Sequence, residues 1–299
     1  MFPQRIFALS SLAVCLLAQP FTSVAADFSF KDKPGESLDV LQDGKLVARY
    51  MYGHDVSTPQ RRDETYKPYL HVFDAAGKET ITKGAGGQLP HHRGIFIGWN
   101  KLSVAGEVFD RWHMKGGDQV HQKFLDQKTT PNSATFTSQV EWMGKDASKV
   151  VLKEDRTFTF LTPPPSTYAL IDTSSKLTAV GGETELGGDP EHAGLQFRPS
   201  GDIVPTETSF FFPGNPDLKK DRDLPWYGGT FTIRGQRYSV VYLNHPSNPK
   251  DAVTSAYRDY GRFGTFFKDV IPAGGEKTIR ARFLVSEGEM PSAEIIQKA

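Results

Sequence analysis

The strongest constraint on the fold is a succession of short segments in which apolar and polar residues alternate, each closed by turn residues. The clearest pair, 37–41 and 45–50, flanks the turn Gln42-Asp43-Gly44 and predicts a β-hairpin. Further strand-like segments lie at 68–73, 95–99, 135–142, 150–152, 156–160, 168–172, 175–180, 195–198, 229–233, 238–243 and 278–285. This pattern predicts an all-β fold, a large antiparallel β-sandwich or supersandwich, with one short terminal helix at 292–298.

The N-terminus has the pattern of a secretory signal peptide. Arg5 precedes an apolar run at 6–17, and small residues before Asp27 suit cleavage. The apolar run is shorter than a membrane span, so we do not expect a retained anchor. We therefore predict a signal peptide at 1–26, a single β-sandwich domain at 27–299, and export to the periplasm or the cell exterior.

Charge and composition exclude several classes of function. Lys+Arg and Asp+Glu both number 35, so the chain lacks the global field that attracts nucleic acids or anionic membranes. No second apolar segment approaches membrane length. The single cysteine, Cys15, lies in the predicted signal peptide, which leaves the mature chain without a disulfide, a thiol nucleophile or a thiolate metal site. The many aromatic residues favour strands and surfaces that stack on sugars.

Histidine occurs in three loops that each adjoin a strongly apolar strand. Histidine titrates near neutrality, serves as an acid or base and binds metals. Strand ends often converge on one pocket, so these loops predict a shared site. They are Gln88-Leu89-Pro90-His91-His92-Arg93-Gly94, Asp189-Pro190-Glu191-His192-Ala193-Gly194 and Asn244-His245-Pro246-Ser247-Asn248-Pro249.

Two further polar clusters accompany these loops. Phe109-Asp110-Arg111-Trp112-His113 combines an acid, a base and two rings, and Asp259-Tyr260-Gly261-Arg262-Phe263-Gly264 places an arginine between glycines. Neighbouring Asp and Arg residues are usually surface ion pairs of little energy. The sequence leaves open whether Arg93 and Arg111 bind a ligand or are buried partners of Asp110 and Asp155.

Seven motifs together resemble a known bacterial family of exported proteins, the one catalogued as "methane oxygenase PmoA". The resemblance runs from about residue 67 to residue 285, and it assigns no settled activity. The motifs are Lys67-Pro68-Tyr69-Leu70, Leu89-Pro90-His91-His92-Arg93-Gly94-Ile95-Phe96-Ile97-Gly98, Asp110-Arg111-Trp112-His113, Asp189-Pro190-Glu191-His192-Ala193-Gly194-Leu195-Gln196-Phe197-Arg198, Trp226-Tyr227-Gly228-Gly229, Asn244-His245-Pro246-Ser247-Asn248-Pro249 and Tyr260-Gly261-Arg262-Phe263-Gly264.

The name of that family does not lead us to predict methane oxidation. The membrane subunit of methane monooxygenase is a bundle of transmembrane helices, and this sequence contains no set of segments of that length. The resemblance instead implies exported carbohydrate metabolism, in which large β-sandwiches similar to galactose-mutarotase-like folds handle sugars.

Our first hypothesis is a carbohydrate-active enzyme of the epimerase, lyase or hydrolase type. Proton transfer at a sugar needs a positioned acid and base, for which His92 and His192 are the candidates, with Glu191 orienting a histidine or itself acting as the base. Arginine forks bind carboxylate or hydroxyl pairs, and Trp99, Trp112 and Trp226 could stack on a sugar or simply fill the core. The predicted substrate-binding residues are His91, Arg93, Trp112, His113, Arg198, His245 and Arg262.

Two alternatives stay open at the level of sequence. A histidine-rich site could bind a divalent metal through His91, His92, His113, His121 and His192 with Glu191, although no spacing matches an established ligand motif. The other is a non-catalytic glycan-binding module, whose ring content and β architecture need no chemistry. Convergence of His92, Glu191 and His192 favours catalysis, and a triad of imidazoles at ligand distance favours the metal.

Overall fold

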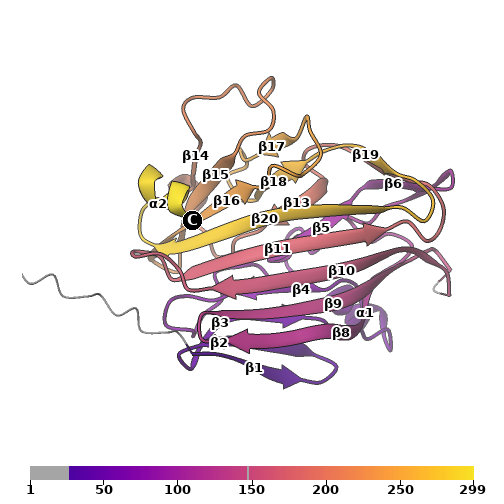
Figure 1. The fold of residues 1–299 in the computed structure, drawn as a ribbon, viewed down its shortest axis with the longest axis horizontal. Helices are drawn as coiled ribbons and strands as arrows, with labels where there is room; N and C mark the ends of the chain where they lie inside the picture. The colour runs from indigo at the N-terminus through magenta and orange to yellow at the C-terminus, as the bar shows by residue number, and fades with distance from the viewer. Residues whose placement is uncertain (1–26, 147) are drawn as a thin grey trace, which may run out of the picture.

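The computed structural model describes residues 27–146 and 148–299, and the predicted signal peptide at 1–26 lies outside them. The described chain folds into three sheets of antiparallel strands (Figure 1). The prediction of a large antiparallel β-sandwich is confirmed.

Two eight-stranded sheets form the body of the molecule. The first sheet contains, in spatial order, β1 (Phe28–Lys33), β2 (Ser37–Gln42), β3 (Lys45–Met51), β4 (Tyr69–Val72), β5 (Ile95–Trp99), β13 (Ala193–Phe197), β18 (Phe263–Phe266) and β17 (Val253–Ser255). The second sheet contains β14 (Ser209–Phe211), β15 (Trp226–Ile233), β16 (Gln236–Asn244), β20 (Glu276–Glu287), β11 (Ala169–Thr178), β10 (Val150–Leu161), β9 (Ser133–Met143) and β8 (Gln119–Thr130).

A third, four-stranded sheet and three short helical segments complete the described fold. The third sheet contains β19 (Asp269–Ile271), β12 (Thr184–Gly187), β6 (Lys101–Val104) and β7 (Glu107–Phe109). The helical segments are α1 (Pro59–Thr65), the 3₁₀ turn η1 (Pro205–Glu207) and α2 (Ala293–Lys298).

Turn chemistry explains why the first hairpin forms where the sequence predicts it. Gln42 pairs with Lys45, so Asp43 and Gly44 form a two-residue loop between β2 and β3. Both loop residues have positive φ angles, 52° and 75°. Aspartate and glycine tolerate this region, and such turns match the right-handed twist of the paired strands.

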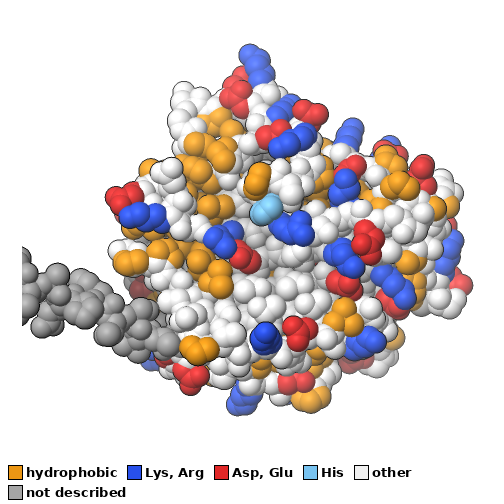
Figure 2. Space-filling view, in the orientation of Figure 1, with side chains coloured by type: hydrophobic (Ala, Val, Ile, Leu, Met, Phe, Trp, Pro, Cys, Tyr) orange, Lys and Arg blue, Asp and Glu red, His pale blue; other side chains and the backbone are white. Residues whose placement is uncertain are grey.

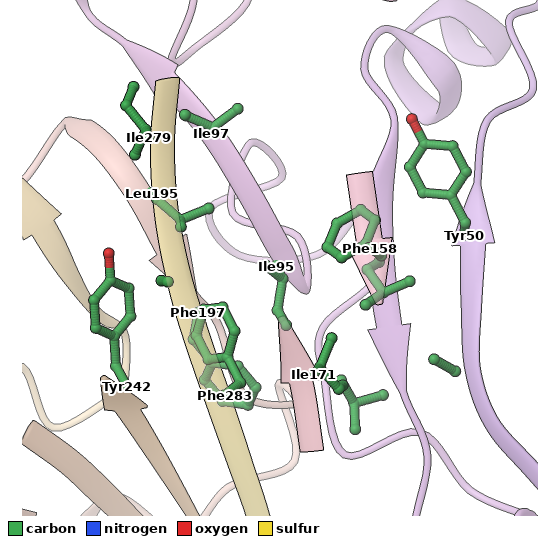
Figure 3. Close-up of a cluster of buried hydrophobic side chains, with 14 of the residues drawn as sticks. Tyr50, Ile95, Ile97, Phe158, Ile171, Leu195, Phe197, Tyr242, Ile279 and Phe283 are labelled. Carbon is green, nitrogen blue, oxygen red and sulfur yellow. The ribbon is translucent and has the colours of Figure 1, made fainter. Parts of the chain in front are cut away.

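The two large sheets pack face to face through their aromatic and aliphatic residues. Phe197 of β13 in the first sheet lies against Phe283 of β20 in the second, with ring centroids 6.2 Å apart. Tyr50 of β3 likewise contacts Phe158 of β10, at 5.9 Å. Figure 3 shows these side chains meeting between the strands. Alternation explains the arrangement, because one set of alternate residues along each strand enters this core.

One ion pair is buried in the core. Glu154 and Arg156, two residues apart on β10, are 0% and 3% exposed and are joined by two hydrogen bonds of 2.9 and 2.8 Å. Arg156 also donates to the carbonyl oxygen of Pro68, which precedes β4 of the first sheet. Arg156 is therefore a buried partner of Glu154, whereas Asp155 points away and pairs with Lys176. Such a fully bonded pair links the two sheets in one arrangement.

The two α-helices differ in how well the sequence predicts them. The predicted terminal helix is confirmed as α2, with Ser292 accepting a hydrogen bond from the backbone N–H of Ile295. Helix α1 was not predicted, although Thr58 caps it and Pro59 opens it, both ordinary start signals. None of its residues is buried, so it lacks the apolar periodicity that reveals most helices. In the part of the chain that the structure describes, no helix is long and apolar enough to cross a membrane.

Candidate functional site

A small aromatic cluster marks the outer face of the first sheet. Ile97 of β5 belongs to the core between the sheets, whereas the adjacent Phe96 packs with Tyr69 and Trp112 in a separate buried cluster. Successive residues of a strand point to opposite faces, so this cluster lies on the outer face. The ring of His92 sits against it, 6.2 Å from Phe96 and 5.5 Å from Trp112 between centroids.

A tight turn in front of β5 fixes the first two histidines. The backbone N–H of His92 donates to the carbonyl oxygen of Leu89, which has a positive φ of 52°. Gly94 ends the turn with a φ of 45°, and a Cβ at this position would lie 2.1 Å from the carbonyl oxygen of Leu70. The turn leaves the side chain of His92 only 3% exposed and that of His91 partly exposed.

Two more histidines are held by one repeated local arrangement, Asp-x-x-His. The Nδ1 atom of His113 lies 2.9 Å from Oδ2 of Asp110, and Nδ1 of His192 lies 2.8 Å from Oδ1 of Asp189. Each carboxylate also accepts a backbone N–H of its own turn, from His113 and from Glu191. When Nδ1–H is donated to the aspartate, Nε2 of a neutral ring is left as the proton acceptor.

The hydrogen bonds from histidine also keep the two aspartates ionised. Burial alone would raise the pKa of Asp110, but the hydrogen bonds from His113 bring this pKa below its usual value. The pKa of Asp189 is lowered in the same way against burial, by hydrogen bonds from His192 and Asn100. The two carboxylates are therefore available as acceptors that fix the orientation of the His113 and His192 rings.

The four imidazoles form one continuous row, which we call the histidine cluster. The ring centroids are 4.4 Å apart between His92 and His91, 4.5 Å between His91 and His113, and 5.3 Å between His113 and His192. Three separate parts of the chain, preceding β5, following β7 and preceding β13, supply these rings. The structure thus brings together two of the three predicted histidine loops, and adds His113.

Basic side chains lie beside the histidine cluster, on the side that faces the sheet. Lys67 is 1% exposed, donates to the carbonyl oxygen of Trp112 at 3.2 Å and lies 4.2 Å from the ring centroid of Phe96. Arg262 is fully buried and is held by Gln196 at 2.7 Å and Ser255 at 2.9 Å. Burial, followed by the positive charge of neighbouring arginines, lowers the pKa of Lys67 well below its usual value.

This environment keeps two of the histidines uncharged. Burial, and then the charges of Lys67, His113 and His192, lower the pKa of His91 to about 3. Burial also lowers the pKa of His92, assisted by His91 and by the arginines nearby. Arg198 and Arg262, which form no ion pair within the described residues, favour an anionic ligand on their side of the cluster.

Several buried polar atoms at the cluster have no hydrogen-bond partner among residues 27–146 and 148–299. Both ring nitrogens of His92 are in this state, as are Nε1 of Trp112 and the Nε atoms of Arg198 and Arg262. Leaving a buried donor or acceptor unpaired costs about 1–3 kcal/mol, so native proteins rarely leave several together. Unpaired groups at one place indicate where a ligand or water binds.

Glu191 lies at the rim of the histidine cluster and does not have the predicted role of base or of partner to a histidine. This carboxylate accepts from Tyr257 at 2.8 Å and from both Arg258 Nε, at 3.1 Å, and Arg258 Nη2, and no hydrogen bond joins it to His192 in the described chain. Against burial, the hydrogen bonds with Arg258 and Tyr257 lower the pKa of Glu191, which makes it a poor base. Asp189, not Glu191, orients His192.

Two other predicted contacts need correction because the side chains are buried. Trp112 and Trp99 are fully buried, so neither offers a face on which a sugar could stack. The guanidinium of Arg93 is also buried and donates to the backbone oxygens of Pro90, Glu64 and Asp63. Arg93 therefore anchors helix α1 to the turn that carries the histidines.

The remaining predicted arginines lie beside the cluster. Arg198 lies over the ring of Tyr260 and donates to its carbonyl oxygen, and Tyr260 in turn has its ring centroid 5.9 Å from that of His92. The guanidinium carbon of Arg262 lies 6.0 Å from the ring centroid of Trp112. Arg111, left open by the sequence, is fully buried, and its guanidinium donates to backbone carbonyl oxygens, including that of Met143.

Two predicted histidines lie elsewhere. His245 lines a cleft of about 490 Å³ with residues of β10, β11, β16 and β20 in the second sheet. His121 of β8 pairs with Ser138 at 2.7 Å and packs against Tyr52. Neither residue contributes to the histidine cluster.

The donor geometry does not fit the metal alternative. Histidines paired with carboxylates are common in the surroundings of bound metals, so the two Asp-x-x-His turns are compatible with ligation in principle. Yet no three His, Cys, Asp or Glu side chains of the described residues are arranged to hold a metal ion.

The structure adds functional candidates that are not among the residues predicted from the sequence. Asp110 and Asp189 stand three residues before a histidine, and this repeated spacing was available as a signal. Lys67 belongs to a motif of the resembling family, but nothing in the sequence tells that it is buried without a carboxylate partner. Tyr260 is likewise recognisable only from its packing.

A family model described as "Family of unknown function (DUF6807)" matches residues 37–299. No curated protein matches this chain.

Several solved structures match this chain over most of its length. One is a heparinase III, 10% identical, with 88% of this chain and 36% of that chain covered and a TM-score of 0.39. Another is a galactose mutarotase related enzyme from Lactobacillus acidophilus, 9% identical, with 88% and 98% covered and a TM-score of 0.37. A third is the 4-alpha-glucanotransferase from Thermococcus litoralis, 8% identical, with 86% and 39% covered and a TM-score of 0.30. This chain thus spans little more than a third of the heparinase.

Proposed function

Because the chain belongs to a family of unknown function, DUF6807, we propose its function from the histidine cluster: a carbohydrate-active enzyme of the lyase type that acts on carboxylate-bearing sugars. The observation that carries this proposal is the pair of aspartate-oriented imidazoles, His113 and His192, in an otherwise cationic site. The steps below follow from the positions of these residues.

The charges around the cluster support an anionic substrate. The buried guanidinium groups of Arg198 and Arg262 lie beside the site and donate to uncharged oxygens of Tyr260, Gln196 and Ser255, and no carboxylate of the described residues pairs with either. Burying a charge without a partner is costly. A substrate carboxylate supplies the missing partner, and its own negative charge is neutralised in return.

Neutralising that carboxylate has a chemical consequence. A sugar C–H bond next to a carboxylate is a weak acid, because its conjugate base places a second negative charge on the same group. Fixed cations aimed at the developing charge lower this barrier. The cationic side of the cluster thus prepares the carbon for proton abstraction.

The spacing of the two oriented imidazoles favours elimination over two-base epimerisation. A sugar ring held between two rings needs them about 7 Å apart, since non-bonded carbons pack about 3.5 to 4 Å apart. The centroids of His113 and His192 are 5.3 Å apart, so both rings address one side of a substrate. In an elimination, one ring takes the proton from carbon, a carbon–carbon double bond forms, the carbon–oxygen bond breaks, and the leaving oxygen receives a proton from the same side.

The experiment that tests this proposal is an assay of the purified protein on uronate polysaccharides, with product identification by mass spectrometry. Elimination gives oligosaccharides with a conjugated double bond that absorbs in the ultraviolet, and each is one water lighter than a hydrolysis product. We expect such products from at least one uronate polymer and none from a neutral glucan. Hydrolysis products alone, or activity unchanged in His192→Asn, would contradict the proposal.

Carbohydrate binding without catalysis is the second candidate, and the cleft of about 490 Å³ on the opposite sheet favours it. Under that alternative the uronate polymer binds and no product forms, so the same assay separates the two. A bound divalent metal is tested alongside by elemental analysis of the purified protein. Export also belongs to the proposal, because the predicted signal peptide lies outside the described residues; the resemblance to the family catalogued as PmoA stays a prediction.

A further inference from the structure

The outer face of the second sheet carries a cleft that is separate from the histidine cluster. The cleft has a volume of about 490 Å³, within the range of small-molecule sites. It lies across β10, β11, β20 and β16, next to the end of α2, on the face that Figure 1 and Figure 2 present to the viewer. Its lining includes Thr157, Thr159, Asn244, His245, Arg280 and Arg282.

Strand alternation places polar side chains in this cleft. Phe158 and Phe160 of β10 point into the core, so Thr157 and Thr159 point outward. In the same way the buried Ala281 of β20 separates Arg280 and Arg282, which share the outer face.

The two guanidinium groups in the cleft differ in how many of their hydrogen-bond donors already have a partner. Arg282 binds both carboxylate oxygens of Asp172, at 2.5 and 2.8 Å, and donates to the carbonyl oxygen of Ala299. Arg280 has a single side-chain hydrogen bond, to the hydroxyl of Ser247 at 3.3 Å, and forms no ion pair within residues 27–146 and 148–299. The cleft thus retains a fixed positive charge with most of its donors free.

The neighbours of Arg280 extend the set of available donors. His245 uses Nδ1 to bind Ser247 at 2.7 Å, which leaves Nε2 facing away from that contact. The hydroxyls of Thr157 and Thr159 are bonded to Thr137 and Thr135 of β9, so the rows of hydroxyls hold one another in position. No aromatic residue other than His245 lines the cleft, which makes it unsuitable for an aromatic or largely apolar ligand.

We propose that this cleft is a second, non-catalytic binding site, and that its ligand is a carboxylate-bearing sugar unit of a glycan chain. A planar carboxylate matches the free fork of Arg280, and hydroxyl and amide side chains around it match the hydroxyls of a sugar. The inference rests on the contacts in the cleft and does not depend on the reaction proposed for the histidine cluster. A glycan bound here is held on the face of the sandwich opposite to that cluster.

The test is an NMR titration of the isotope-labelled protein with trigalacturonic acid, followed through the amide signals of Ser174 and Asn244. We expect saturable shifts of both signals, no shift with the neutral maltotriose, and a Kd at least tenfold weaker in Arg280→Gln. The matched control is Arg237→Gln, which removes another arginine of the second sheet outside the cleft lining and should leave the titration unchanged. Signals that do not move, that move equally in Arg280→Gln, or that respond equally to maltotriose would overturn the proposal.

Discussion

The two outer faces of the sandwich are built from the same alternating strands but treat their polar groups differently. On the first sheet, His92 and Arg262 are buried over an aromatic floor, and His92 has no hydrogen-bond partner in the described chain. On the second sheet, Thr157 and Asp172 are partly exposed and bonded, to Thr137 and to Arg282.

This difference indicates which face is suited to chemistry. A solvent-exposed hydroxyl or ion pair that already has its hydrogen bonds contributes little to the free energy of unfolding. Such a group can also bind a ligand without strain in the fold. On the first face, carboxylates orient the imidazoles, and buried cations beside them have no carboxylate partner in the described chain. Burying such charges lowers the stability of the fold, which is typical of a functional site. We therefore assign catalysis to the first face and binding alone to the second.

The largest contrast between the faces should appear in turnover. His113→Asn keeps a group that can bond Asp110 but removes Nε2, so turnover of the uronate substrate should fall by about 10²–10⁴-fold. The matched variant on the second face, His245→Asn, should retain the wild-type rate constant for a short substrate. Steady-state kinetics on both variants measures this, with melting temperatures as the folding control. Equal losses in the two variants would remove the distinction between the faces.

A second contrast concerns the free energy of unfolding. His92→Leu replaces a buried ring without hydrogen-bond partners by an apolar side chain of similar size, so the free energy of unfolding should stay within about 1 kcal/mol of wild type or rise. The same variant should bind a uronate trisaccharide at the histidine cluster less tightly. Urea denaturation gives the free energy of unfolding, and an NMR titration followed through the imidazole signals of His91 and His113 gives the affinity at the histidine cluster. A loss of several kcal/mol would show that His92 is a structural residue and not part of a ligand site.

The lowered pKa of His91 predicts a dependence of stability on pH. Unfolded His91 takes up a proton as the pH falls below 6.5, whereas the folded residue does so only near pH 3. The contribution of His91 to stability is therefore present above pH 6.5 and is lost as the pH falls from 6.5 towards 3. His91→Gln should make the free energy of unfolding depend less steeply on pH in this window.

Urea denaturation at several pH values between 3 and 6.5 measures that slope. His71 and His121, whose pKa values burial lowers to about 4, act in the same direction and keep part of the slope in the variant. Arg280→Gln on the second face serves as the control, because a guanidinium does not titrate there. An unchanged slope in His91→Gln would mean that its folded environment does not disfavour the charged ring.

The smallest effect is expected from the hydroxyl rows of the second face. Thr157→Val removes one of two mutually bonded hydroxyls at a partly exposed strand position, where valine has a similar shape and high strand propensity. The free energy of unfolding should change by no more than about 0.5 kcal/mol, as for most surface substitutions. A thermal melt with its enthalpy measures this. A larger loss would make the hydroxyl rows a structural element and not a binding surface.

The parts of this account that the sequence could predict are those that depend on local pattern. The hairpin at Asp43-Gly44, most of the long strands and helix α2 follow from alternation and turn or cap residues, which act over a few positions. The convergence of the loops at 91–94 and 191–194 was expected from strand ends.

Other features depend on contacts between distant segments and could not be predicted. Lys67 is functional in this account because it is buried against Phe96, and Trp112 loses its expected stacking role because its ring is covered. His245 has the same kind of loop as His192 but ends a strand of the other sheet, so the two face opposite sides. Only the spacing of Asp110 and Asp189 before their histidines could have been read in advance.

The most direct test of the histidine cluster as the ligand site is an NMR spectrum of the imidazole nitrogens during titration with a uronate trisaccharide. The protein has eight histidines, so each ring can be followed separately. We predict that the signals of His91, His92, His113 and His192 shift together with one Kd, while those of His54, His71 and His121 stay in place. Binding that leaves all four cluster signals unchanged would contradict the account.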